Sequence, residues 1–209
     1  MRLVRAGIHF YIVGILILTF GIALTILSMM GTSPYDSLLV GLNRTFGFTV
    51  GTWEVVLGLS LLIFNAIAEK RRPELFAMIT SVITGIGIDS WLFLLENVVI
   101  PEAWAGEFGY YLLGLLFTCL GTACYLQSSI APNPLDRAML VVTNLTGLSV
   151  TYSRSLISIV LVILAFFFDG AIGLGTLINA LFSGLIISLF LPYFESLHHR
   201  LHRRLERVS

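Results

Sequence analysis

The chain has 209 residues, of which 57% are hydrophobic and only 11% are charged, and the formal net charge is zero. A soluble domain carries roughly 25% charged residues, so this composition excludes a water-soluble fold. The apolar runs are about 20 residues long, which fits membrane-spanning helices and excludes a β-barrel built from alternating segments of about 10 residues.

Six apolar runs are long enough to cross a hydrocarbon layer of about 30 Å as helices. They cover residues 7–30, 50–68, 75–97, 109–127, 151–168 and 171–194. The first run is too long for the apolar region of a secretory signal peptide, and no small-residue cleavage site follows it. With short loops these spans fill nearly the whole chain, so we expect a single membrane domain over residues 1–209 without a soluble catalytic module.

Lysine and arginine in short loops stay on the cytoplasmic side, and this bias predicts the orientation. With a cytoplasmic N-terminus, the cations on that side are Arg2, Arg5, Lys70, Arg71, Arg72, Arg137, Arg154, Arg200, Arg203, Arg204 and Arg207. Only Arg44 falls outside, and the outer loop after the third span holds Glu102, Trp104 and Glu107. Both termini are therefore predicted to be cytoplasmic.

Two shorter helices are predicted at residues 34–46 and 134–146. At 1.5 Å per residue each is about 20 Å long, which is too short to cross the membrane, so each is either re-entrant or interfacial. Both begin with an N-cap residue, a proline at the first helical position and a carboxylate in the first turn. These residues are Ser33, Pro34 and Asp36 in one helix, and Asn133, Pro134 and Asp136 in the other.

The two halves of the chain repeat each other at a fixed offset of 100 residues. The matches include Gly14 with Gly114, Gly21 with Gly121, Pro34 with Pro134, Asp36 with Asp136 and Gly47 with Gly147, and Gly85 pairs with Gly184 after a one-residue slip. Chance matches between apolar segments would involve leucine and isoleucine rather than these residue types. The sequence therefore predicts a duplication, with repeat 1 near residues 7–98 and repeat 2 near residues 107–194.

Each repeat contains three spans, which is an odd number, so the second copy is predicted to be upside down relative to the first. The fold class is then an all-α membrane bundle with a 3+3 inverted repeat. Secondary transporters use this architecture, with short helices of both halves beside a midplane site. If the short helices instead cross the whole membrane, the two repeats have the same orientation. Arg137 and Arg154 must then be reassigned in the topology.

The acids Asp36 and Asp136 are candidates for an ion or substrate pathway, together with the cap residues Ser33 and Asn133. A carboxylate in the first turn also interacts with free amides and with the helix dipole, so capping explains both acids without a ligand. Free helix N-termini can bind an anion, but an adjacent aspartate opposes that.

Three further charged residues lie inside spans and join the candidate pathway. Glu54 and Arg154 occupy equivalent positions, and they are expected near opposite membrane faces, so we expect no direct salt bridge. Arg154 can also reach cytoplasmic headgroups by snorkelling. Asp89 lies deeper, where it is either a proton-coupling group or a hydrogen-bonded structural acid.

Three segments resemble the YczE/YitT-type bacterial integral membrane proteins. They are Gly31-Thr32-Ser33-Pro34-Tyr35-Asp36, Gly47-Phe48-Thr49-Val50-Gly51-Thr52-Trp53 and Gly173-Leu174-Gly175-Thr176-Leu177-Ile178-Asn179-Ala180. The resemblance covers essentially the whole chain and implies a transporter-like, multi-pass protein of the bacterial inner membrane. It supplies no catalytic or substrate-binding residue. Ile88-Asp89 also resembles a pattern near the end of each repeat, where the second copy has Ile187-Ser188.

The segment from residue 195 to residue 209 is predicted to be a basic amphipathic tail. Leucines recur every four residues among arginines and histidines, which favours a helix on the cytoplasmic leaflet that contacts anionic lipid headgroups. We expect no nucleic-acid partner for so short a basic patch. The histidines lack metal-ligand spacing, and the spacing of Cys119 and Cys124 excludes a disulfide between them, so we expect no metal and no cofactor.

These patterns predict a secondary transporter of a small molecule or ion that works by alternating access and has no catalytic residues. The alternative is a membrane scaffold or regulator of a partner protein without transport. An intramembrane enzyme is disfavoured because the sequence offers no nucleophile with a base. Association into a homo-oligomer is compatible with either function.

Overall fold

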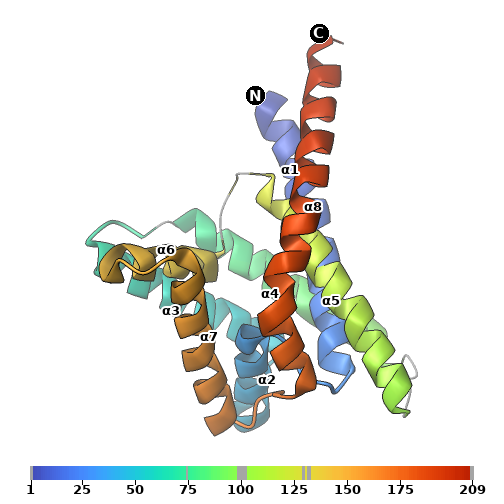
Figure 1. Cartoon of the computed structure of the whole chain (residues 1–209), viewed down its shortest axis with the longest axis vertical. Coiled ribbons are helices and arrows are strands. Elements are labelled where there is room, and N and C mark those ends of the chain that lie inside the picture. Colours follow the sequence, from blue (N-terminus) through green and yellow to red (C-terminus); the bar gives the residue numbers. More distant parts are fainter. Residues whose placement is uncertain (1, 74, 98–102, 129, 131–132, 208–209) are drawn as a thin grey trace.

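The computed structural model describes residues 2–73, 75–97, 103–128, 130 and 133–207, with side chains described between residues 7 and 198. All regular structure in these ranges is helical (Figure 1): α1 (Arg2–Leu27), α2 (Pro34–Phe46), α3 (Val50–Glu69), α4 (Leu75–Leu95), α5 (Trp104–Leu126), α6 (Pro134–Thr146), α7 (Val150–Phe167) and α8 (Leu174–Arg207). Within this part of the chain, six helices are long and apolar enough to cross a membrane, namely all except α2 and α6. The predicted helical membrane bundle is confirmed.

The helices α1 and α5 run antiparallel and form the most extensive contact in the molecule (Figure 1). Glycines make the close approach possible. A Cβ atom on Gly121 would lie 2.7 Å from the carbonyl oxygen of Gly14, and one on Gly21 would lie 2.7 Å from the carbonyl oxygen of Gly114. Small residues at a crossing let two backbones touch, and such packing is a main source of helix association in membranes.

The short helices α2 and α6 have the bounds that the sequence predicts. Ser33 caps α2 by accepting a hydrogen bond from the Asp36 amide, and Asn133 caps α6 by accepting one from the Leu135 amide. Each helix ends at a glycine with positive φ, 77° at Gly47 and 73° at Gly147, a conformation that residues with side chains rarely adopt.

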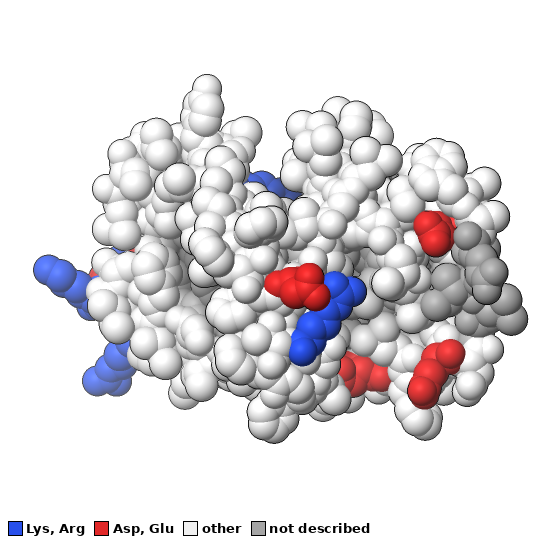
Figure 2. All heavy atoms as spheres, turned by 90° about the horizontal axis from the view of Figure 1, so that it is seen from below, with Lys and Arg blue, Asp and Glu red and all other residues white. Residues whose placement is uncertain are grey.

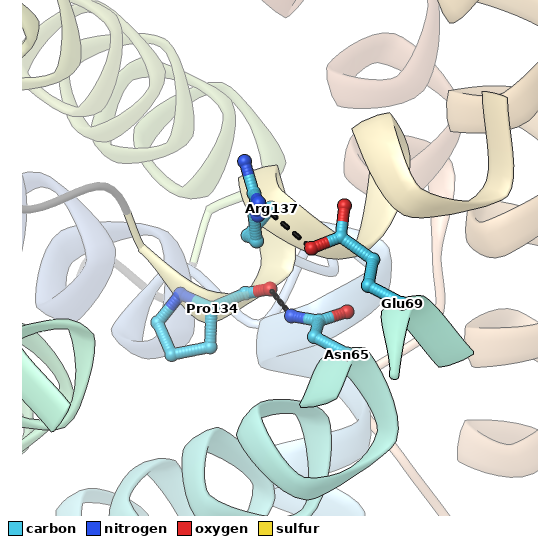
Figure 3. Close-up of polar contacts among 4 residues, drawn as sticks. All are labelled: Asn65, Glu69, Pro134 and Arg137. Carbon is cyan, nitrogen blue, oxygen red and sulfur yellow. Dashed lines mark hydrogen bonds and ion pairs between the residues drawn. The ribbon is translucent and has the colours of Figure 1, made fainter. Parts of the chain in front are cut away.

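Each short helix packs against the other half of the chain, α2 against α7 and α6 against α3. The Ser37 hydroxyl of α2 donates to the carbonyl of Ala171, which follows α7, over 2.9 Å. Figure 3 shows the contact of α6 with α3, where the Asn65 side chain donates to the Pro134 carbonyl over 3.1 Å and Arg137 pairs with Glu69 over 2.8 Å. These bonds tie the start of α6 to the second half of α3.

The pair α3 and α4 is closed, whereas the equivalent pair α7 and α8 is not. At the α3–α4 crossing, a Cβ atom on Gly85 would lie 2.5 Å from the carbonyl oxygen of Gly51, so the two backbones are in contact. The helices α7 and α8 lack an extensive contact. For a Cβ atom on Gly184, the counterpart of Gly85, the described residues place only the Arg154 guanidinium within 4 Å.

Several predicted boundaries were wrong by a few residues. The helix α1 ends at Leu27, before the predicted residue 30, because Met29 has a φ of 57°. The helix α5 begins at Trp104, so this residue and Glu107, predicted in a loop, lie in its first turn. The first helix, α1, and the last helix, α8, extend to the same end of the molecule (Figure 1). Most of the surface visible from the opposite end is uncharged (Figure 2).

The predicted C-terminal tail is helical, but it continues α8 to Arg207 and forms no separate element. The Pro192 ring is accommodated inside this helix, and the sequence after it contains no glycine or proline that would end it. The basic side chains from residue 199 onward, and the last residues 208 and 209, lie outside the described residues. Contact of the tail with lipid headgroups stays a prediction.

Candidate substrate cavity

A half-enclosed cavity of about 550 Å³ lies between α7 and α8 and reaches the starts of α2 and α6. Its polar walls come from hydroxyl, amide and guanidinium groups, and its apolar walls come mainly from α6 and α7. The lining residues include Ser33 and Tyr35 from α2, Leu135 and Met139 from α6, Thr151, Arg154, Ser155, Ser158 and Leu161 from α7, and Asn179, Ala180, Ser183 and Gly184 from α8. A volume of roughly 300–1,000 Å³ is typical of small-molecule sites.

The cavity lies beside α7 and α8, and the described residues at the equivalent positions of α3 and α4 are packed. Four lining residues of α8 match, at an offset of 99, four buried residues of α4: Asn179 with Thr80, Ala180 with Ser81, Ser183 with Thr84 and Gly184 with Gly85. On α7, the lining residues Thr151, Arg154 and Ser158 match Gly51, Glu54 and Gly58, all of which are buried. Equivalent positions therefore line a cavity in repeat 2 and a packed interface in repeat 1.

Glu54 and Asp36 form a buried acidic pair. Glu54 is 1% exposed and Asp36 is 5% exposed, and the two carboxyls are close enough to interact electrostatically. Burial raises the pKa of Asp36, which lies outside the six spanning helices, to about 6, although a hydrogen bond donated by the Ser33 hydroxyl acts in the opposite direction. Tyr35 lines the cavity and is close enough to Glu54 to interact with it electrostatically.

Asp136 has a different environment from its counterpart Asp36. Its carboxylate accepts a hydrogen bond from the Tyr125 hydroxyl over 2.7 Å. Burial raises the pKa of Asp136, while the Tyr125 bond and the positive charge of Arg154 oppose that rise. Arg137, the neighbour that could have been its charge partner, pairs instead with Glu69. The described part of the chain contains no ion pair between Glu54 and Arg154.

Ser33 and Asn133 provide the side-chain caps of α2 and α6, as the sequence predicts, and Asp36 and Asp136 lie in the first turns. Among the described residues, neither aspartate accepts a hydrogen bond from a backbone amide. Asp89 does so, since its Oδ1 atom accepts from the Gly51 amide at the start of α3 over 2.8 Å. Asp89 is thus a hydrogen-bonded acid that joins α4 to α3, apart from the cavity.

The structure brings together part of the predicted candidate set and adds to it. Ser33 and Arg154 line the cavity, and the buried acids Asp36 and Glu54 interact with the lining residues Ser33 and Tyr35. Residues that the sequence reasoning did not assign to the site are Tyr35, Tyr125, Ser155, Ser158, Asn179 and Ser183. Asn179 and Ser183 could have been found by extending the repeat at its offset of 99.

Six apolar helices, with a cavity of mixed polar and apolar lining between two of them, define a multi-pass integral membrane protein. Over residues 5–192 the chain matches a family described as a family of unknown function (DUF6198), and it belongs to this family. No solved structure matches the chain.

Curated relatives agree with this class. The chain is 43% identical to "Uncharacterized protein YyaS" of Bacillus subtilis, over 89% of this chain and 92% of the relative. It is 30% identical to "Uncharacterized membrane protein YczE" of the same organism, over 96% and 93% of the two chains. An "Uncharacterized protein" of Haemophilus influenzae is 29% identical over 88% and 82%. The resemblance to the YczE type is therefore confirmed.

Proposed function

We propose that the protein is a secondary transporter, not an enzyme, and moves a small molecule or ion across the bacterial inner membrane by alternating access. One observation carries this proposal: equivalent helix pairs are packed differently, α3 closed on α4 and α7 held away from α8. The function of a scaffold that keeps one conformation does not require two equivalent interfaces to be packed differently, whereas alternating access does.

The inverted repeat is part of the proposal, and the exchange of contacts between halves supports it. The contact of Gly14 with Gly121 becomes that of Gly114 with Gly21 when the repeats are exchanged. The contacts of α2 with α7 and of α1 with α4 likewise have counterparts in those of α6 with α3 and of α5 with α8. With three spans in each half, such an exchange fits a pseudo-two-fold axis in the membrane plane, with α2 and α6 as re-entrant helices.

In such an architecture the second state arises when the halves exchange conformations. The helices α3 and α4 would then separate, and α7 and α8 would close. The cavity wall on α7 covers residues 150–161, from the end of the helix that the cation bias assigns to the cytoplasm, and the wall on α8 covers residues 179–184, in the outer half of that span. The cavity therefore reaches the middle of the membrane, and in this proposal it opens to the cytoplasm.

Equivalent cysteines test alternating access directly. Ser183→Cys and Thr84→Cys are placed singly in a background with Cys119 and Cys124 replaced by alanine. Ser183 is 7% exposed and lines the cavity, whereas its counterpart Thr84 is 3% exposed and is not among the lining residues. We expect a membrane-impermeant thiol reagent to reach position 183 from the cytoplasmic side and position 84 from the outside. The proposal fails if position 84 never reacts from outside, or if proteoliposomes show no protein-dependent flux of any solute in a broad panel.

A further inference from the structure

Arg154 extends from α7 across the cavity toward α8. Its Nη1 atom lies 3.7 Å from the position that a Cβ atom on Gly184 would occupy, and the residue is part of the cavity wall. The side chain therefore spans the gap between the two helices. Snorkelling toward headgroups, the alternative from the sequence, would direct the guanidinium away from the middle of α8.

The guanidinium has no partner of its own in the part of the chain that the structure describes. The ion pair in that part joins Arg137 and Glu69, and no described group accepts a hydrogen bond from Arg154. Its charge acts on Asp136 through space, but that carboxylate is bonded to Tyr125. Arg154 is exposed, and its guanidinium lies in the gap between α7 and α8. An ionisable residue inside a membrane span is a candidate for a substrate or ion pathway.

The cavity wall carries one formal charge, and that charge is positive. Among the described residues, no aspartate or glutamate lines the cavity. Other polar groups line the same cavity and can donate to an anion: Thr151, Ser158, Asn179 and Ser183. The Ser33 hydroxyl already donates to Asp36, and the Ser155 hydroxyl donates to the Thr151 carbonyl. A planar guanidinium matches a carboxylate in a bidentate geometry, so the site favours that anion.

Apolar side chains make up the rest of the wall, including Met139, Ile157 and Leu161. They give an organic body a surface to pack against, which an inorganic ion does not need. We propose that the cavity binds a small organic acid, with its carboxylate on Arg154 and its carbon skeleton against α6 and α7. This inference rests on the proposed function and names the substrate class of the same site.

Binding is tested first, in phosphatidylcholine nanodiscs with a panel of mono- and dicarboxylates, amines, and inorganic phosphate. A thiol-reactive dye reports unfolding through Cys119 and Cys124, which are buried. We expect at least one carboxylate to raise the melting temperature by about 5 °C at saturation. Arg154→Gln should weaken that binding about tenfold or more, Arg154→Lys should do so less, and Arg72→Gln, which removes an exposed cation outside the cavity, should leave it unchanged.

Flux in proteoliposomes then separates the two proposals. Carboxylate binding that depends on Arg154, without flux, would overturn transport and leave the carboxylate site standing. Flux of amines or neutral solutes that survives Arg154→Gln, without stabilisation by any carboxylate, would overturn the carboxylate site and leave transport standing. Stabilisation only by phosphatidylglycerol added to the nanodiscs would mean a lipid headgroup occupies the cavity, and it would also overturn the inference.

Discussion

The same substitution at two equivalent glycines should have opposite consequences. Gly85 and Gly184 are counterparts in the repeat, but Gly85 lies in the α3–α4 contact and Gly184 faces the cavity. A Cβ atom on Gly85 would lie 2.5 Å from the carbonyl oxygen of Gly51, and ordinary contact begins at 3.4 Å. The helices must therefore separate by about 0.9 Å, the difference between these two values, because a helical carbonyl cannot turn aside.

The expected difference follows from two opposing terms. Alanine is favoured over glycine inside a helix by about 1 kcal/mol, and this gain applies at both positions. Overpacking costs about 1–3 kcal/mol, and this cost applies only to Gly85→Ala. We therefore expect Gly85→Ala to unfold about 2–12 °C below Gly184→Ala, since each kcal/mol shifts the melting temperature of a chain of this size by about 2–4 °C.

The assay uses the buried native cysteines. Both Cys119 and Cys124 are free and buried in the folded protein, so a thiol-reactive dye reports unfolding during a thermal ramp. Gly184→Ala should keep or raise the melting temperature, yet lower solute flux by narrowing the space into which α7 must close. Equal melting temperatures for the two variants would refute the reasoning, because the α3–α4 contact would then not be tighter than its counterpart.

Four further outcomes are expected. A double-mutant cycle with Glu69→Gln and Arg137→Gln should give a coupling free energy of about 0.5–1 kcal/mol. The value is modest because the two side chains are 17% and 26% exposed, so solvent screens the ion pair. Strictly additive effects of the two substitutions would argue against the pair. Ser33→Ala should lower the free energy of unfolding by about 0.5–2 kcal/mol because it removes the cap of α2. Asp36→Asn should leave a folded protein without flux, because it removes the carboxylate that would take part in transport. Full flux of this variant would instead assign that part to Glu54, the neighbouring buried acid. A cysteine at position 71, with both native cysteines removed, should be labelled only from the cytoplasmic side, and labelling in intact cells from outside would contradict the topology.

The sequence predicted the helices well because their ends are marked by residues with specific backbone roles. Pro34 and Pro134 follow cap residues, and Gly47 and Gly147 take positive φ, so the bounds of α2 and α6 agree with the prediction. The end of α8 lacks such a marker. Without a glycine or proline after Pro192 the helix continues, and an apolar run alone could not show where it ends.

The site was predicted only in part, because it depends on how far apart two helices lie. Periodicity identifies an apolar face but does not say whether that face is packed. Gly51 and Gly58 on α3 allow close contact with α4, whereas Thr151 and Ser158 on α7 occupy the equivalent space with side chains. This difference is visible in the sequence but acquires meaning only once α3–α4 and α7–α8 are compared in three dimensions.

The bond between Asp89 and the Gly51 amide was likewise beyond sequence reasoning. The two residues lie 38 positions apart on different helices, and the acceptor bonds to a backbone group that any residue type except proline provides. Depth in the span correctly marked Asp89 as an acid in need of a partner. It could not show that the partner is the N-terminus of a neighbouring helix.

The glycine crossing of α1 and α5 also bears on how the chain arose. Gly14 meets Gly121 and Gly21 meets Gly114, so each helix presents the same two positions to the other. This is the geometry of an isologous interface, which two identical subunits form around a two-fold axis. A half-length ancestor could thus have paired with a second copy of itself inserted in the opposite orientation. Fusion of the genes would then have freed the halves to diverge, giving Glu54 to one and Arg154 to the other.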